Sequence, residues 1–326
     1  MRGRRTIAGA LALTGLVLTA CYPPSQNPTD QPLPPGGRVV ATGPILTEMW
    51  IEDATDDVSV IVYGQSDFLL DFDPRPYRFW VVDDRTGTTT RVPVGLAEYG
   101  SASLSPDGSF VVFSSNDRFI QSGPATANCQ YRRDMWAPPT ATYCDELYLF
   151  DLESGATRQL TGLGGSSELD HTQPVVTADG SAVEFTTRDL DTPATYHRMD
   201  LETGEITDAI APTRPTSWDR GSHVVEWDAV TGTLTSQDAA TGTVTTLWEH
   251  EATYHLESAA GNGRYVVVSH WQTERLQVFR LIDTDTGTVR PIHSGWVADD
   301  GSRYAFVQLN VAPEAIDRLV IAPLPT

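Results

Sequence analysis

From Arg38 onward the chain consists of short apolar runs separated by Gly, Asp, Asn and Thr, with no convincing helical stretch. Runs such as Phe110 to Ser115 and Glu146 to Asp151 have the length and the content of β-branched and aromatic residues that are typical of strands. Other runs follow one another closely, as in His223 to Asp228 and Thr233 to Asp238. The pattern predicts an all-β protein.

Two turn signals recur between these runs. The first is Asp-x-x-Ser/Thr-Gly, as in Asp151 to Gly155, and the second is a tight polar turn closed by glycine, as in Ser105-Pro106-Asp107-Gly108. In each, an Asp side chain can accept hydrogen bonds from the turn while glycine adopts a positive φ. The closing glycines of the second turn are Gly108, Gly180, Gly221, Gly263 and Gly301.

These glycines recur at a period of about 40 residues, which with four short strands per unit is the signature of a β-propeller blade. A degenerate first unit, with Asp56-Asp57 as its turn, gives six blades. The last unit has strands near Trp296, Tyr304 to Gln308 and Leu319 to Ala322 and then stops. We expect Arg38 to Thr42 to supply its fourth strand, because this pairing closes the ring and removes exposed sheet edges.

The repeat resembles that of a known family. Leu104-Ser105-Pro106-Asp107-Gly108 is similar to the Ser-Pro-Asp-Gly repeat of TolB-like propellers. The run from Leu147 to Gly155, with Arg158-Gln159-Leu160-Thr161 after it, is similarly close to that family. The resemblance covers residues 38–326 and implies a six-bladed propeller. It implies no single activity, since such propellers host binding proteins, peptidase appendages and lyases.

The N-terminus carries an export signal. Arginines at positions 2, 4 and 5 precede an uncharged run from Ile7 to Ala20, which is too short to span a bilayer as a helix. Leu18-Thr19-Ala20-Cys21 looks like a bacterial lipobox, so residues 1–20 are read as a lipoprotein signal peptide and Cys21 as the lipidated residue. Residues 21–37 form a proline-rich tether with no apolar periodicity.

The charge limits the classes of partner. The formal charge is −21, all 22 basic residues are arginine, and lysine is absent. Such a chain is not expected to bind nucleic acid, and we expect it to contact the membrane through its lipid anchor only. The absence of lysine also removes Schiff-base chemistry and a P-loop.

The remaining cysteines, Cys129 and Cys144, are predicted to form a disulfide, which export permits. A metal site is the alternative, but no histidine lies near them. They enclose Arg132, Arg133 and Trp136 in the connection between the second and third strands of blade 2. In a propeller this connection lies at the mouth of the central channel, so we predict that these three side chains bind a partner.

Three histidines, His171, His255 and His293, occupy near-equivalent positions before the first strands of blades 3, 5 and 6. Converging imidazoles could hold a transition metal, and some propeller lyases resemble this arrangement. The alternative is that they are polar residues around a water-filled channel. Asp67, Asp71 and Asp73 could attract calcium, although they lack the spacing of a calcium loop.

These observations predict a monomeric, lipid-anchored propeller on the extracytoplasmic face of the cell membrane. We expect it to bind an envelope protein or a small ligand without catalysis and without a cofactor. The other hypothesis is a metal-dependent lyase or hydrolase that uses the three histidines. No Gly-x-Ser-x-Gly nucleophile motif supports a peptidase.

Overall fold

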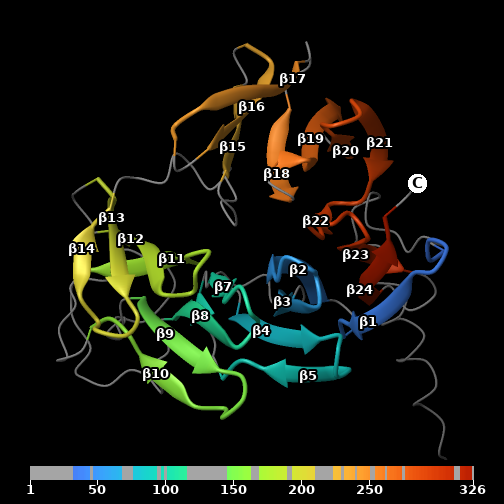
Figure 1. Ribbon diagram of the computed structural model, residues 1–326. Helices are drawn as coiled ribbons and strands as arrows, with labels where there is room; N and C mark the ends of the chain where they lie inside the picture. The colour runs from blue at the N-terminus through green and yellow to red at the C-terminus, as the bar shows by residue number, and fades with distance from the viewer. Residues whose placement is uncertain are drawn as a thin grey trace, which may run out of the picture.

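The protein is described by a computed structural model over residues 32–44, 47–67, 76–93, 97–98, 101–115, 145–162, 169–188, 193–209, 223–228, 231–238, 241–249, 254–260, 263–273, 276–311 and 316–324. Within these ranges the elements are strands, arranged as six sheets around a centre (Figure 1). None of the described segments forms a helix with the length and apolar content needed to cross a membrane.

Each sheet is one blade. Blade 1 contains β2 (Thr47–Ala54), β3 (Val60–Asp67), β4 (Pro76–Asp83) and β5 (Thr88–Arg91), with β6 (Ala97–Glu98) paired to β4. Blade 2 contains β7 (Ala102–Leu104), β8 (Phe110–Ser115), β9 (Glu146–Asp151) and β10 (Thr157–Gln159). Blade 3 contains β11 (Asp170–Val176), β12 (Ala182–Arg188), β13 (Thr195–Asp200) and β14 (Ile206–Asp208).

Blade 4 contains β15 (His223–Asp228), β16 (Thr233–Asp238) and β17 (Val244–Glu249). Blade 5 contains β18 (His255–Ala260), β19 (Tyr265–Thr273), β20 (Leu276–Asp283) and β21 (Thr288–Ile292). Blade 6 contains β22 (Gly295–Val297), β23 (Arg303–Val311), β24 (Ile316–Pro323) and β1 (Arg38–Thr42). Strands β2, β7, β11, β18 and β22 lie nearest the centre of the ring (Figure 1).

The architecture predicted from the turns is confirmed. The strands from Phe110, Glu146, His223 and Thr233 have the expected bounds, and blade 1 is present despite its degenerate turn. Strand β1 pairs antiparallel with β24, with Arg38 opposite Ile321 and Thr42 opposite Arg318, so the N-terminal strand closes blade 6 as expected. The predicted first strand of blade 4 and its turn at Gly221 lie outside the described residues.

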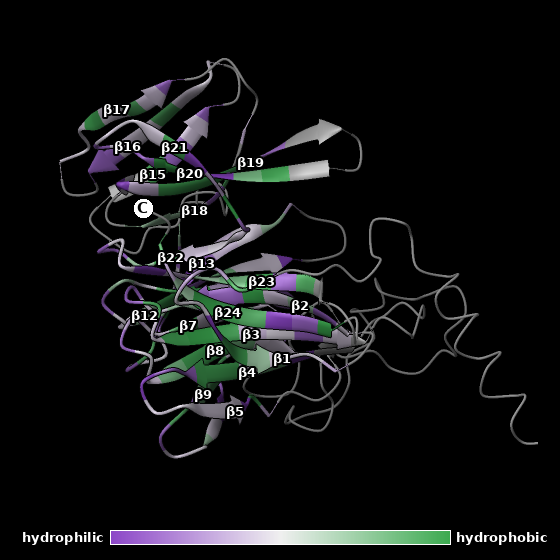
Figure 2. Cartoon of the chain, turned by 90° about the vertical axis from the view of Figure 1, so that its right-hand side faces the viewer, coloured by the Kyte–Doolittle hydropathy of each residue, from purple (hydrophilic) through white to green (hydrophobic). Residues whose placement is uncertain are grey.

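The apolar core is divided among the junctions between blades. Separate clusters of buried side chains fill junctions 1–2, 6–1, 5–6, 2–3 and 4–5. Figure 2 shows hydrophobic residues along strands such as β3, β8 and β24, while the turns are hydrophilic. Successive residues of a strand point to opposite faces of its sheet, so a blade packed on both sides needs apolar residues at consecutive positions.

The glycine turns between first and second strands lie against the preceding blade. A Cβ on Gly108 would lie 2.8 Å from Val60 Cγ2 of blade 1, and one on Gly301 would overlap the ring of Tyr265 in blade 5. In blade 1 the glycine position is taken by Val58, which has φ of 54° and a buried side chain in the 6–1 cluster. Val58 therefore fills space in the junction that closes the ring.

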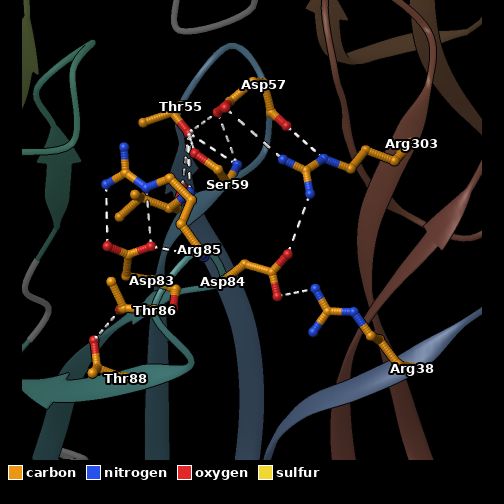
Figure 3. Close-up of polar contacts among 11 residues, drawn as sticks. Arg38, Thr55, Asp57, Ser59, Asp83, Asp84, Arg85, Thr86, Thr88 and Arg303 are labelled. Carbon is orange, nitrogen blue, oxygen red and sulfur yellow. Dashed lines mark hydrogen bonds and ion pairs between the residues drawn. The ribbon is translucent and has the colours of Figure 1, made fainter.

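Arginines from blade 6 also hold this junction. Asp84, whose side chain is only 6% exposed, accepts hydrogen bonds from Arg38 on β1 and from Arg303 on β23, the latter at 3.2 Å (Figure 3). Arg303 Nε also donates to the carbonyl oxygen of Asp57 at 2.7 Å. Charged hydrogen bonds to a shielded carboxylate are stronger than neutral ones, so the closing strand is fixed by more than its ladder.

Side chains of one blade also satisfy the inner strand of the next. Buried Asp53 of β2 accepts from Ser103 Oγ at 3.1 Å and from the backbone N–H of Leu104 at 2.7 Å, both in blade 2. Ser103 Oγ in turn accepts from the backbone N–H of Val176 in blade 3 at 3.0 Å. In junction 6–1, Asp317 accepts from the N–H of Met49 at 3.0 Å. The bonds of Asp53 and Ser103 therefore join neighbouring inner strands, and that of Asp317 joins β24 to the inner strand of blade 1.

Candidate functional site

One face of the ring, here called the mouth face, carries the connections between the second and third strands of the blades. The turns between the first and second strands, such as those closed by Gly108 and Gly301, lie on the opposite face. In blade 2, β8 ends at Ser115, which is the register partner of Glu146 at the start of β9, so the strand ends that flank residues 116–145 lie at the mouth face. The corresponding connections of blades 3, 5 and 6 are the short ranges 189–194, 274–275 and 312–315.

The long connection ends against blade 3. The backbone N–H of Asp145 donates to Asp170 Oδ1 at 2.9 Å, and the N–H of His171 donates to the carbonyl oxygen of Asp145 at 2.8 Å. Asp145 is 1% exposed. The predicted disulfide Cys129–Cys144, the predicted binding residues Arg132, Arg133 and Trp136, and the predicted lipidation site Cys21 lie outside the described residues.

His171 is at the centre of a polar cluster beside this anchor. It lies inside β11 rather than before it, and its Nδ1 is 3.0 Å from Thr187 Oγ1. Its Nε2 is 3.9 Å from Glu146 Oε2, which accepts a 2.5 Å hydrogen bond from Thr161 Oγ1. Burial, with a smaller effect from nearby His197, lowers the pKa of His171 to about 4. His171 is therefore neutral at physiological pH and acts as a hydrogen-bonding group.

The three predicted metal ligands lie on three different blades. His293 precedes β22 and stacks on Phe306 with ring centroids 4.6 Å apart, and burial lowers the pKa of its imidazole. His255 begins β18, where its backbone is the register partner of Ser269 in β19. His255's side chain is not among those described, so the metal site stays a prediction. Over the described side chains, no group of three or more His, Cys, Asp or Glu could hold a metal ion.

Four rings form a second cluster on the mouth face, between blades 4 and 5. Trp227 and Trp248 lie 5.9 Å apart between centroids, and both contact Tyr254, at 5.8 and 5.6 Å. Tyr254 is 6% exposed and meets His270 edge-on at 5.0 Å. The tryptophans also pack on the apolar cluster of junction 4–5.

Two acids near the mouth face and the channel, the buried Glu146 and the half-buried Glu52, were not singled out by the sequence. Glu146 directly follows the long connection, and Glu52 is an extra residue in β2 at a break in its register with β3. Burial raises the pKa of Glu52 to about 7, although hydrogen bonds from Trp50 Nε1 and from the backbone of Ala102 lower it in part. A bulge turns one additional side chain out of the alternation, which a strand pattern alone does not reveal.

The comparisons with known proteins do not place the chain in a family. No protein-family profile matches the chain, and no curated protein matches it. Among solved structures, TolB from Acinetobacter baumannii is 18% identical with a TM-score of 0.43; the match covers 76% of this chain and 55% of that one. This chain therefore spans about half the length of that TolB.

Other matches cover most of both chains. A putative TolB from Agrobacterium tumefaciens is 15% identical with a TM-score of 0.46, covering 89% of this chain and 94% of that one. An oligogalacturonate lyase in complex with manganese is 13% identical with a TM-score of 0.48, covering 89% and 93%. Likeness at this level carries no argument about activity. The strand pairing itself shows a six-bladed β-propeller, the fold that the resemblance in the sequence implies.

Proposed function

We propose that this protein is a lipid-anchored, extracytoplasmic propeller that binds an envelope protein or a small ligand on its mouth face and catalyses no reaction. The observation that carries the proposal is the length of the connection 116–145, which is far longer than its counterparts in the other blades, between two strand ends at the mouth face. Loops of this length in a compact domain are commonly functional.

The chemistry of this connection supports a docking role. In a chain of net charge −21, Arg132 and Arg133 are two consecutive positive residues, and Trp136 follows three positions later in the sequence. Arginine and tryptophan are the residue types that most often dominate binding energy at interfaces. An acidic or aromatic patch on the partner would complement this set.

The binding test compares one triple variant with one double variant, both made in the full chain. Arg132→Ala/Arg133→Ala/Trp136→Ala should abolish recovery of a partner that is cross-linked to the wild-type protein in intact cells. Arg85→Ala/Arg158→Ala removes exposed arginines from outside the mouth face and should leave recovery unchanged. Equal recovery with both variants, or equal loss, would contradict the assigned face.

The anchor is tested separately. Cys21→Ser should eliminate metabolic labelling with palmitate and release the protein from the membrane fraction, whereas Cys129→Ser should do neither. Elemental analysis of protein purified without chelators tests the claim of no catalysis, since a stoichiometric transition metal would support the metal-dependent hypothesis instead.

A further inference from the structure

A turn ahead of β1 sets the direction from which the tether reaches the propeller. The backbone N–H of Gly37 donates to the carbonyl oxygen of Pro34 at 2.8 Å, and Gly36 has a φ of 73°, so residues 34–37 form a tight turn. Strand β1 leaves this turn toward the mouth face, because it pairs antiparallel with β24, which begins there. The residues before the turn therefore run the opposite way, from the mouth side toward the turn.

Contacts at the two ends of this segment agree with that direction. A Cβ on Gly36 would lie 3.0 Å from Pro323 Cγ, at the end of β24 that is farthest from the mouth face. The carbonyl oxygen of Pro32 accepts a hydrogen bond from Gln308 Nε2 at 3.3 Å, and Gln308 is the register partner of Arg318 near the start of β24. Pro32 therefore lies nearer the mouth face than Gly36 does.

The rest of the tether has a limited reach. Residues 21–31 contain three prolines, a composition that favours an extended chain. At about 3.1 Å per residue these residues span about 34 Å. Strand β23 has nine residues, so a blade is about 30 Å tall at about 3.3 Å per residue. A tether that continues in the direction of residues 32–34 reaches the lipid on the mouth side. To bring the opposite face to the lipid, it would have to turn back along the blade.

The face opposite the mouth face, here called the turn face, carries carboxylates that stay ionised. Hydrogen bonds from neighbouring hydroxyl and backbone N–H groups lower the pKa of five aspartates in its turns, which are Asp107, Asp151, Asp179, Asp200 and Asp300. Arginines on this face are paired with other acids, as Arg85 is with Asp83 and Arg303 with Asp84. An anionic lipid surface repels such a face within about 10 Å.

We propose that the mouth face is turned toward the membrane and the turn face away from it, and that the partner of the mouth face is a protein held in or on the same membrane. The inference rests on the lipid anchor of the proposed function and adds the orientation of the ring to it. The direction of the tether decides which face lies near the lipid, and the charge of the turn face opposes the inverted arrangement. A soluble partner would have to enter a gap that the tether limits to about 34 Å.

Two threonines at opposite ends of one strand provide a matched test of the orientation. Thr195 begins β13 at the mouth face, Thr203 lies in the turn that follows β13, and both are exposed. Thr195→Cys and Thr203→Cys are made in the lipidated protein, labelled with a fluorescent donor and bound to vesicles of phosphatidylethanolamine and phosphatidylglycerol that contain an acceptor lipid. Unsubstituted protein labelled in parallel gives the background.

The two positions differ in height by about 17 Å or more, so energy transfer to the lipid should be at least about twofold greater from position 195. Equal transfer from both positions, or greater transfer from position 203, would overturn the orientation while leaving the anchor intact. Absence of transfer from both positions would refute the anchor, and the orientation with it.

A bulky maleimide reagent tests whether the mouth face is shielded from soluble macromolecules. Anchoring to vesicles should slow modification of Thr195→Cys at least about threefold relative to Thr195→Cys/Cys21→Ser, which lacks the lipid. Thr203→Cys should react at the same rate with and without Cys21→Ser. If anchoring slowed neither variant, or both equally, the mouth face would be as open to soluble partners as the turn face, which contradicts a partner held at the membrane.

Discussion

Junctions 6–1 and 3–4 lie on opposite sides of the ring and are built in opposite ways. At junction 6–1 the chain ends pair in one sheet, an apolar cluster fills the space between blades, and Arg38 and Arg303 converge on Asp84. At junction 3–4 the described strands β12, β13, β16 and β17 turn polar, solvated side chains toward each other, among them Glu184 and Arg198, and we call these facing side chains the seam. The comparison teaches that the junction which joins the first and last strands of the ring combines strand pairing, apolar packing and charged hydrogen bonds.

The difference originates in single residues of the middle strands. Val60, Ile61 and Val62 follow one another in β3, so blade 1 is apolar on both faces. In β12 the same positions alternate between apolar and polar residues, which gives one packed face and one solvated face. Val58 extends the contrast, because a side chain replaces glycine at the turn that faces blade 6.

Deletion of residues 38–43 should have the largest effect on this comparison. It removes the four ladder pairs of β1 and the Arg38–Asp84 contact. At about 1 kcal/mol per hydrogen bond, the free energy of unfolding should fall by about 4 kcal/mol or more. Thermal denaturation should show a melting temperature lower by roughly 10 °C. Deletion of residues 24–29 in the tether is the control and should leave the melting curve unchanged; two identical curves would disprove closure by β1.

The next largest difference is expected between single apolar side chains of the two junctions, in their contribution to the free energy of unfolding. Leu319 is fully buried in the 6–1 cluster, so Leu319→Ala should lower the free energy of unfolding by about 3 kcal/mol. Val244 lies on the seam face and is 59% exposed, so Val244→Ala should change it by less than about 0.5 kcal/mol. Urea denaturation measures both variants. A large loss with Val244→Ala would show that the seam is packed.

The ion pairs of the two junctions should differ by a smaller margin. Asp84→Asn removes the charge that Arg38 and Arg303 share and should cost about 2 kcal/mol, since hydrogen bonds to charged groups are the strong ones. Glu184→Gln at the seam should cost less than about 0.5 kcal/mol, because its pair with Arg198 is exposed. Equal losses in denaturant titrations would mean that junction 6–1 does not depend on its charged cluster.

The sequence predicted the fold because its signals are local. The polar turns require particular residues at fixed positions, and glycines with positive φ occur at Gly108, Gly155 and Gly180 as the turns demanded. The closing role of Arg38 to Thr42 followed from an incomplete last blade and the penalty for unpaired edges.

The candidate site was less predictable because it depends on which strands become neighbours. His171 was singled out as a possible metal ligand, but the sequence did not indicate that Glu146 and His197 lie beside it. The alternation in β12 and β16 was visible as Val-Glu-Phe-Thr and Leu-Thr-Ser-Gln. That two solvated faces meet at one junction became evident only when the clusters were assigned to blades.

The smallest predicted effect is a pH-dependent weakness inside junction 6–1. Burial of Asp56 in blade 1, together with the carboxylates of Asp299 in blade 6 and of Asp57, raises the pKa of Asp56 to about 6. Because this pKa is higher in the folded than in the unfolded chain, protonated Asp56 favours folding below about pH 4, and that contribution is lost as the pH rises through 6. Asp56→Asn stays neutral and should stabilise the protein at pH 8 by about 1 kcal/mol, after allowance for solvent around a half-buried group, with no gain at pH 4. Asp300→Asn is the matched control, and its expected effect has the opposite sign. Hydrogen bonds from Ser302 lower the pKa of Asp300, so the Asp300 carboxylate favours folding above the unfolded pKa. Asp300→Asn should therefore lose stability at pH 8. Urea titrations at pH 4, 6 and 8 measure both variants; if Asp56→Asn gave no more stability at pH 8 than at pH 4, repulsion between blades 6 and 1 would not limit the strength of the closing junction.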